Sequence, residues 1–67
     1  MTTLTVYDRN VVDPIILSRH LADDLHTSVT VHCEEERGDA RFTSEASVER
    51  VELAAEFWLP LGGWDVR

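Results

Sequence analysis

The chain has 67 residues, the length of one small domain, which excludes a two-domain enzyme. Hydrophobic residues make up 43% and charged residues 28%, a composition typical of a folded chain rather than a disordered segment. Thirteen acidic residues against six basic ones, all of them arginine, give a formal net charge of -7, which argues against direct binding to nucleic acid or to an anionic membrane.

The first part of the chain predicts a strand followed by a helix. Apolar and polar residues alternate over Leu4–Tyr7, which is the pattern of a half-buried strand. Asp13-Pro14 is a typical helix start, because the aspartate accepts bonds from the first-turn amides and the proline lacks only a donor that would be unpaired anyway. We expect this helix to continue to about His26. Its apolar stripe consists of Ile15, Leu17, Leu21, Ala22 and Leu25.

The middle of the chain predicts a β-hairpin. Strands are expected over Ser28–Glu36 and Asp39–Thr43, joined by a turn at which Gly38 supplies a positive backbone φ. A loop with an even number of residues places Cys33 beside the apolar residues of the partner strand, whereas an odd number sets it against a polar one. We expect Cys33 to face the core.

The last part predicts a second helix and a short return strand. The spacing of apolar residues indicates a helix that starts at Ser44 or Ser47 and ends at Leu59, before a proline. Its packing side consists of Val48, Val51, Ala54, Ala55 and Trp58. Residues 64–67 are compatible with a fourth, edge strand, with Leu61 helping to cover the core.

This order of elements predicts an α+β fold in a single domain over residues 1–67. Two helices bury their apolar stripes only on a common sheet face, so we expect an antiparallel sheet with both helices on one side. With the fourth strand the order resembles the ferredoxin-like βαββαβ arrangement, and without it a three-stranded βαββα sandwich remains. The resemblance covers nearly the whole chain and implies a fold, not a chemistry.

Acidic residues form three clusters that are candidates for binding a partner. One surrounds the hairpin turn, one follows the second helix at i, i+4, i+7 and i+11, and one lies on the first helix. The candidate residues are Asp23, Asp24, Glu34, Glu35, Glu36, Asp39, Glu45, Glu49, Glu52 and Glu56. Carboxylates repeated along a rigid element can occupy the arginines and lysines that another protein uses for phosphates. The alternative is a solvated surface that only keeps the protein soluble.

No motif indicates catalysis, a cofactor or a metal. His20 and Asp24, at i and i+4, fit either a mixed metal site or an exposed helix pair. His32 cannot readily activate its neighbour Cys33, because adjacent strand residues point to opposite faces. The sequence contains no glycine-rich phosphate loop and no nucleotide fingerprint. We therefore expect a protein that is not an enzyme and holds no cofactor or metal.

The open face of the predicted sheet supports a second interpretation. It carries Thr5, Tyr7, Thr30, His32, Arg41 and Thr43. With one tyrosine and a negative net charge, this face is poorly suited to stacking RNA bases. We therefore favour a homodimer interface as its function. The alternative function is therefore a small homodimeric interaction or regulatory module, such as an antitoxin or a ligand sensor. Trp64 is either a core residue or an exposed anchor.

In its small size, strong acidity, lack of lysine and lack of catalytic motifs, the sequence resembles phage-encoded inhibitors such as anti-CRISPR proteins and other nucleic-acid mimics. The resemblance implies a non-enzymatic protein that binds a basic surface of a nucleic-acid-handling complex. It lies in size and charge, so no residue roles transfer. Because residues 1–4 lack the regions of a signal peptide and no apolar run approaches about 20 residues, we expect a cytoplasmic location, in the bacterial host cell if the protein is phage-encoded.

Overall fold

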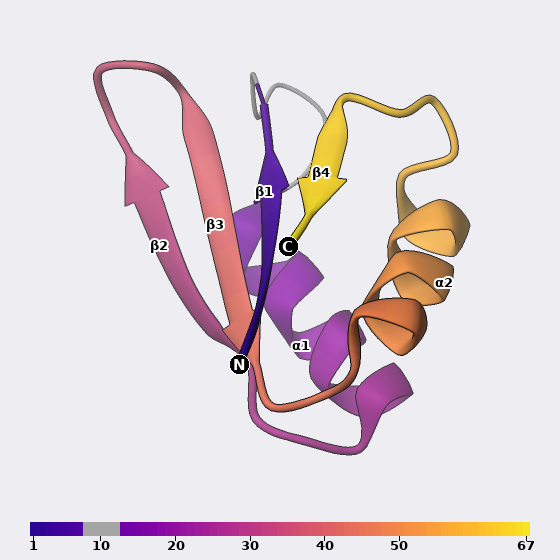
Figure 1. The fold of residues 1–67 in the computed structure, drawn as a ribbon. Helices are drawn as coiled ribbons and strands as arrows, with labels where there is room; N and C mark the ends of the chain where they lie inside the picture. The colour runs from indigo at the N-terminus through magenta and orange to yellow at the C-terminus, as the bar shows by residue number, and fades with distance from the viewer. Residues whose placement is uncertain (8–12) are drawn as a thin grey trace.

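A computed structural model describes residues 1–7 and 13–67 of the chain. Within these ranges the elements are β1 (Thr2–Val6), α1 (Pro14–Leu25), β2 (Thr30–Glu34), β3 (Asp39–Ser44), α2 (Val48–Trp58) and β4 (Trp64–Val66), shown in Figure 1. The strands form one antiparallel sheet in the order β2-β3-β1-β4. This strand order and the βαββαβ element order are compatible with the ferredoxin-like arrangement, so the predicted α+β fold with its fourth strand is confirmed.

Both helices pack on the same face of the sheet, as predicted (Figure 1). In β1, Leu4 points into the core and lies opposite Phe42 of β3 on one side and Val66 of β4 on the other. The helices add Leu17, Leu21 and Leu25 from α1 and Val51, Ala54 and Ala55 from α2. Leu4, Leu21, Ala40 and Ala55 are at most 1% exposed, so the centre of the core lies where β1, β3 and the two helices meet.

Each helix begins at a side chain that caps it. Asp13 accepts hydrogen bonds from the amides of Ile15 and Ile16, at 2.9 and 3.4 Å. Ser47 caps α2 and accepts from the amide of Arg50 at 3.3 Å. The second helix therefore starts after Ser47 and not at Ser44, the earlier of the two predicted starts.

Three residues expected to cover the core are exposed instead. Ile15 is 58% exposed, Val48 is 40% exposed and Leu61 is 93% exposed. Ile15 and Val48 occupy the first turns of their helices, at the ends of the apolar stripes, where the sheet no longer covers them. Leu61 lies in the turn between α2 and β4. Trp64 packs against the core instead, and its indole nitrogen donates to the carbonyl of Leu59 at 3.0 Å.

The hairpin has the register that core packing requires. A four-residue loop, 35–38, joins β2 and β3, and the even count sets Cys33 opposite Ala40. Gly38 has φ 74°, which confirms the predicted glycine turn. Cys33 lies on the core side but is only half-buried, because β2 is one of the two edge strands of the sheet.

The opposite face of the sheet is open and polar. In the described strands its side chains are Thr3, Thr5, Thr30, His32, Glu34, Asp39, Arg41, Thr43 and Asp65, which alternate with the core residues. Tyr7 follows the end of β1 and is 49% exposed. Of the two helices that the structure describes, neither is long and apolar enough to cross a membrane.

Candidate partner-binding surface

The acidic residues of α2 lie on the side of the helix that points away from the sheet. Glu49, Glu52 and Glu56 are exposed, while the sheet-facing side of the helix is buried. Among the residues that the structure describes, none of these three carboxylates has an ion pair. Because residues three and four apart are neighbours on a helix, the three like charges repel one another. Only Arg50 adds positive charge within α2.

On α1, Asp23 and Asp24 are both exposed, and Asp24 is held in place by the other helix. The indole nitrogen of Trp58 on α2 donates to an Asp24 carboxylate oxygen at 2.6 Å. The ring of His20, one turn before Asp24, stacks on the indole with centroids 4.3 Å apart and an interplanar angle of 15°. The predicted pair of His20 and Asp24 is thus bridged by Trp58, which joins α1 to α2.

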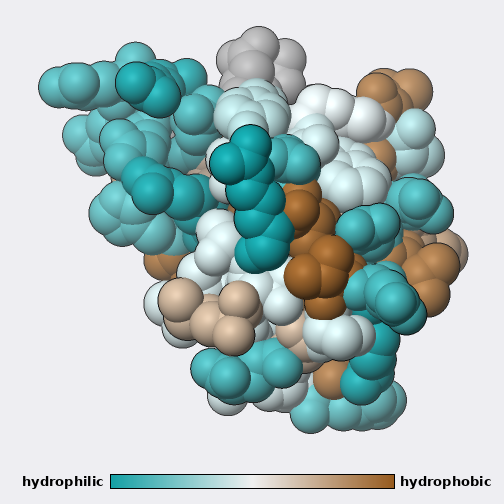
Figure 2. Space-filling model, viewed as in Figure 1, coloured by the Kyte–Doolittle hydropathy of each residue, from teal (hydrophilic) through white to brown (hydrophobic). Residues whose placement is uncertain are grey.

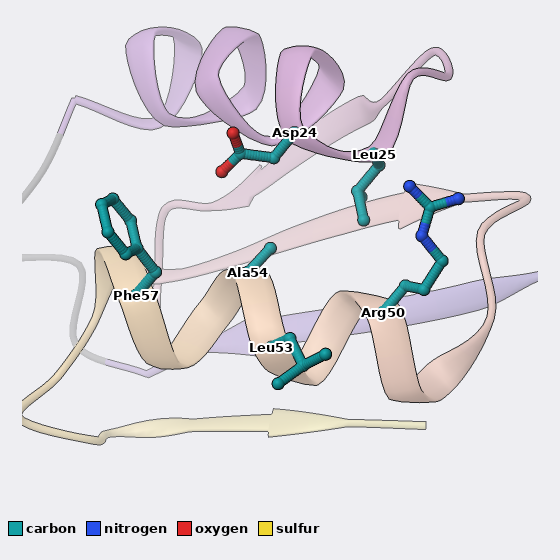
Figure 3. Close-up of a pocket in the computed structure, with 6 residues that line it drawn as sticks. All are labelled: Asp24, Leu25, Arg50, Leu53, Ala54 and Phe57. Carbon is teal, nitrogen blue, oxygen red and sulfur yellow. The ribbon is translucent and has the colours of Figure 1, made fainter.

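A groove of about 290 Å³ runs between the two helices (Figure 3). Two of the residues that line it, Asp24 and Phe57, contact Trp58. It is lined by Asp24, Leu25, Arg50, Leu53, Ala54 and Phe57. Leu53 is 67% exposed and Phe57 is 72% exposed, and they lie one helical turn apart rather than scattered singly. Figure 3 shows the side chain of Arg50 extending toward the C-terminal end of α1, where a cation is favoured by the helix dipole.

The acidic cluster around the hairpin turn is partly neutralised within the chain. Glu34 of β2 and Asp39 of β3 lie directly opposite each other on the open face. Arg41, the next residue on that face of β3, forms an ion pair with Glu34. Glu35 and Glu36 are exposed in the loop. Thr5, Glu34, Glu36, Arg37 and Arg41 line a polar hollow of about 470 Å³.

The two acidic regions lie on different sides of the molecule. In Figure 1 the β2–β3 turn stands at the left of the view and α2 at the right. Figure 2 shows hydrophilic side chains gathered over the hairpin. The predicted stripe along α2 also loses its first member, because Glu45 precedes the Ser47 cap and lies outside the helix. One flat partner surface therefore cannot contact all ten candidate residues at once.

The histidines and the cysteine are dispersed in the part of the chain that the structure describes. No three His, Cys, Asp or Glu side chains there are grouped so that they could hold a metal ion. His32 lies on the open face, opposite Arg41, and Cys33 lies on the core face. His20 is engaged with Trp58. The geometry thus keeps His32 and Cys33 on opposite faces, as the strand pattern predicts.

The apolar residues of the groove are the part of this surface that the sequence analysis missed. Leu53 and Phe57 are four residues apart and lie beside, not within, the stripe of Val51, Ala54 and Ala55. This offset from the packing stripe indicates exposed apolar residues, because large apolar side chains outside the packing stripe of a helix in a small domain remain in water. A charge pattern alone does not reveal it.

Comparison of this chain with protein-family models, with curated proteins and with solved structures finds no match.

Proposed function

We propose that the protein is a non-enzymatic inhibitor that binds a basic, nucleic-acid-binding surface of a target protein, in the manner of anti-CRISPR proteins and other nucleic-acid mimics. The contact surface is the helical layer, and its acidic residues are Asp23, Asp24, Glu49, Glu52 and Glu56. We call these five residues the helix cluster. Binding occupies the target's phosphate-binding groups and so blocks entry of DNA or RNA. The protein acts in the cytoplasm of a bacterial cell.

The observation that carries this proposal is the exposure of the helix cluster without internal ion pairs in the described residues. Along α2, Glu49, Glu52 and Glu56 follow one another at about 5 Å of helix rise. One strand of duplex DNA carries one charge per about 3.4 Å of its axis. The helix thus presents carboxylates at a linear density of the same order, on a rigid support.

Like charges at these spacings lower the stability of the helix. This cost favours a role for the glutamates in binding a partner rather than in folding. Glu52 and Glu56 are at i and i+4, where two like charges destabilise a helix by roughly 0.2–0.5 kcal/mol. A basic partner removes this repulsion when it binds. Charge complementarity also speeds association and makes the complex sensitive to salt.

The alternative function, a homodimeric interaction module, has less support on the open sheet face. In the described strands that face carries threonines, charged groups and His32, and no aliphatic, Phe, Tyr or Trp side chain. Homodimer interfaces usually have an apolar centre, with aromatic residues enriched. His32 and Arg41 lie opposite each other there, and Tyr7 lies beyond the end of β1.

Affinity capture from bacterial lysate tests the proposal. The folded protein serves as bait at low and at moderate salt, with and without competing DNA. We expect a nucleic-acid-binding protein or complex to be retained, to be displaced by DNA and to be retained less at moderate salt. A captured partner that is indifferent to DNA, or recovery of the protein itself alone, contradicts the nucleic-acid mimic and favours the homodimeric module.

A further inference from the structure

The groove between α1 and α2 combines exposed apolar side chains with fixed walls. Leu53 and Phe57 stand four residues apart on α2, and both line the groove. Figure 3 shows Phe57 pointing toward α1 and Leu53 on the outer side of α2. Exposed apolar side chains gathered in a groove with a polar rim mark interaction sites more often than scattered ones do. Leu25 and Ala54 form the floor between them, and both are buried.

The walls of the groove are held before any ligand arrives. Trp58 is fixed by the hydrogen bond to Asp24 and by the stacked ring of His20. Phe57 packs edge-on against Trp58, with centroids 5.0 Å apart and an interplanar angle of 79°. A contact surface that is already ordered loses little conformational entropy on binding, so more of its contact energy contributes to affinity.

Carboxylates border the apolar strip formed by Leu53 and Phe57 on both sides. Asp24 lines the α1 wall of the groove. On α2, Glu49 lies four residues before Leu53 and Glu56 three residues after it, so both are its neighbours on the helix surface. Neither glutamate lines the groove, so both lie on the side of Leu53 that is farther from α1. Among the residues that the structure describes, Arg50 is the only basic one in the lining. The strip therefore favours an occupant with apolar residues at its centre and basic residues at its margins.

A second copy of this chain does not fit that description. In a twofold dimer the same patch pairs with itself, so two patches of the same net negative charge come together. Each copy carries a formal net charge of -7, and of the described residues that line the groove Arg50 alone supplies positive charge. Like charges placed face to face across an interface oppose association.

We propose that this groove binds a basic amphipathic helix of the target protein, with apolar side chains at i and i+3 or i+4 seated against Leu53 and Phe57. The lysines or arginines that flank those anchors contact Asp24, Glu49 and Glu56. This inference rests on the proposed function, since it names the segment of the basic partner that the helix cluster receives. It adds an apolar, shape-selective contact to a binding mode that otherwise depends on charge alone.

The test uses two synthetic peptides of equal composition. One is a leucine and lysine peptide of about 14 residues, roughly four helical turns, with leucines along one face. The other has the same residues in an order that removes the apolar face. Binding is measured by isothermal titration calorimetry at moderate salt, and the contact site by amide chemical shifts in ¹⁵N-labelled protein. We expect the amphipathic peptide to bind at least about tenfold more tightly, with shifts centred on Leu53 and Phe57.

A matched pair of double variants separates apolar docking from folding. Leu53→Gln with Phe57→Gln removes the strip, and Ile15→Gln with Ile16→Gln changes two aliphatic residues of α1 that are 58% and 51% exposed and lie outside the groove lining. We expect the first pair to weaken binding of the amphipathic peptide about tenfold and the second to leave it within about twofold. Circular dichroism verifies that both variants are folded.

Four outcomes overturn the groove proposal, and they differ in what they imply for the proposed function. Equal affinity for both peptides, or undiminished affinity of the Leu53→Gln and Phe57→Gln variant, leaves charge binding in place without apolar docking. If neither peptide binds but DNA still displaces the captured partner, the groove proposal alone is wrong. If neither peptide binds and DNA displaces nothing, both proposals are wrong.

Discussion

Trp58 connects the two helices through its neighbours on α1. Its indole nitrogen donates to Asp24, its ring stacks on His20, and Phe57 packs against its edge. The side chain is half-buried against the core, and it contacts Asp24 and Phe57, which line the groove. A single residue thus sets both the helix–helix contact and the position of an acidic side chain on the candidate surface.

We predict that Trp58 and Asp24 are energetically coupled. A double-mutant cycle combines Trp58→Phe with Asp24→Ala, and urea unfolding measures the stability of each variant. We expect an interaction free energy of about 1 kcal/mol, because either substitution removes the same surface hydrogen bond from the indole to the carboxylate. Trp64→Phe provides the matched control, since its indole donates to Leu59 and not to Asp24. A coupling near zero for the first pair contradicts the bridge between the helices.

At the scale of single elements, local patterns in the sequence predicted where the two helices start and where the hairpin turns. Asp13 and Ser47 cap their helices, and Gly38 adopts the positive φ of the hairpin loop. These features depend on neighbours within a few residues, so the sequence contains the information. The exposure of Ile15 and Leu61 depends on where the sheet and the other helix end, which no local pattern specifies.

The Asp13 cap gives a test of how much one local feature contributes. Asp13→Ala removes both hydrogen bonds to the first turn of α1, so we expect a loss of about 1 kcal/mol in the free energy of unfolding. Asp13→Asn keeps a side-chain oxygen that can cap, and we expect it to retain most of that stability. Urea unfolding measures both variants. If asparagine is as destabilising as alanine, the contribution comes from the charge and not from the cap.

At the scale of the whole molecule, sheet order decides which acidic residues act together. In sequence, the hairpin cluster and the helix stripe are separated by only a few residues, and their charges look continuous. In the fold, the β2–β3 hairpin lies at one edge of the sheet, while α2 packs on α1, β1 and β4 (Figure 1). Tertiary structure therefore divides one apparent acidic surface into two, and the sequence could not predict the division.

The candidate site was only partly accessible from sequence for the same reason. The carboxylates of α2 were recognisable by their spacing, and so was their exposure. The groove needs Asp24 and Leu25 of α1 beside Leu53 and Phe57 of α2, and that juxtaposition arises only when both helices pack on one sheet face. The ion pair of Arg41 with Glu34 likewise depends on the hairpin register.

The most direct test of the central claim compares two charge reversals on the captured partner. Glu49→Arg, Glu52→Arg and Glu56→Arg together reverse the acidic side of α2, and Glu35→Arg, Glu36→Arg and Glu45→Arg make the same change in net charge outside the helices. Affinity for the partner is measured for both triple variants under identical salt, after circular dichroism has verified their folds. We predict that the helix variant loses detectable binding and that the other retains affinity within about tenfold of the original protein. Equal losses in both variants, or unchanged affinity of the helix variant, would contradict the assignment of partner binding to the helical layer.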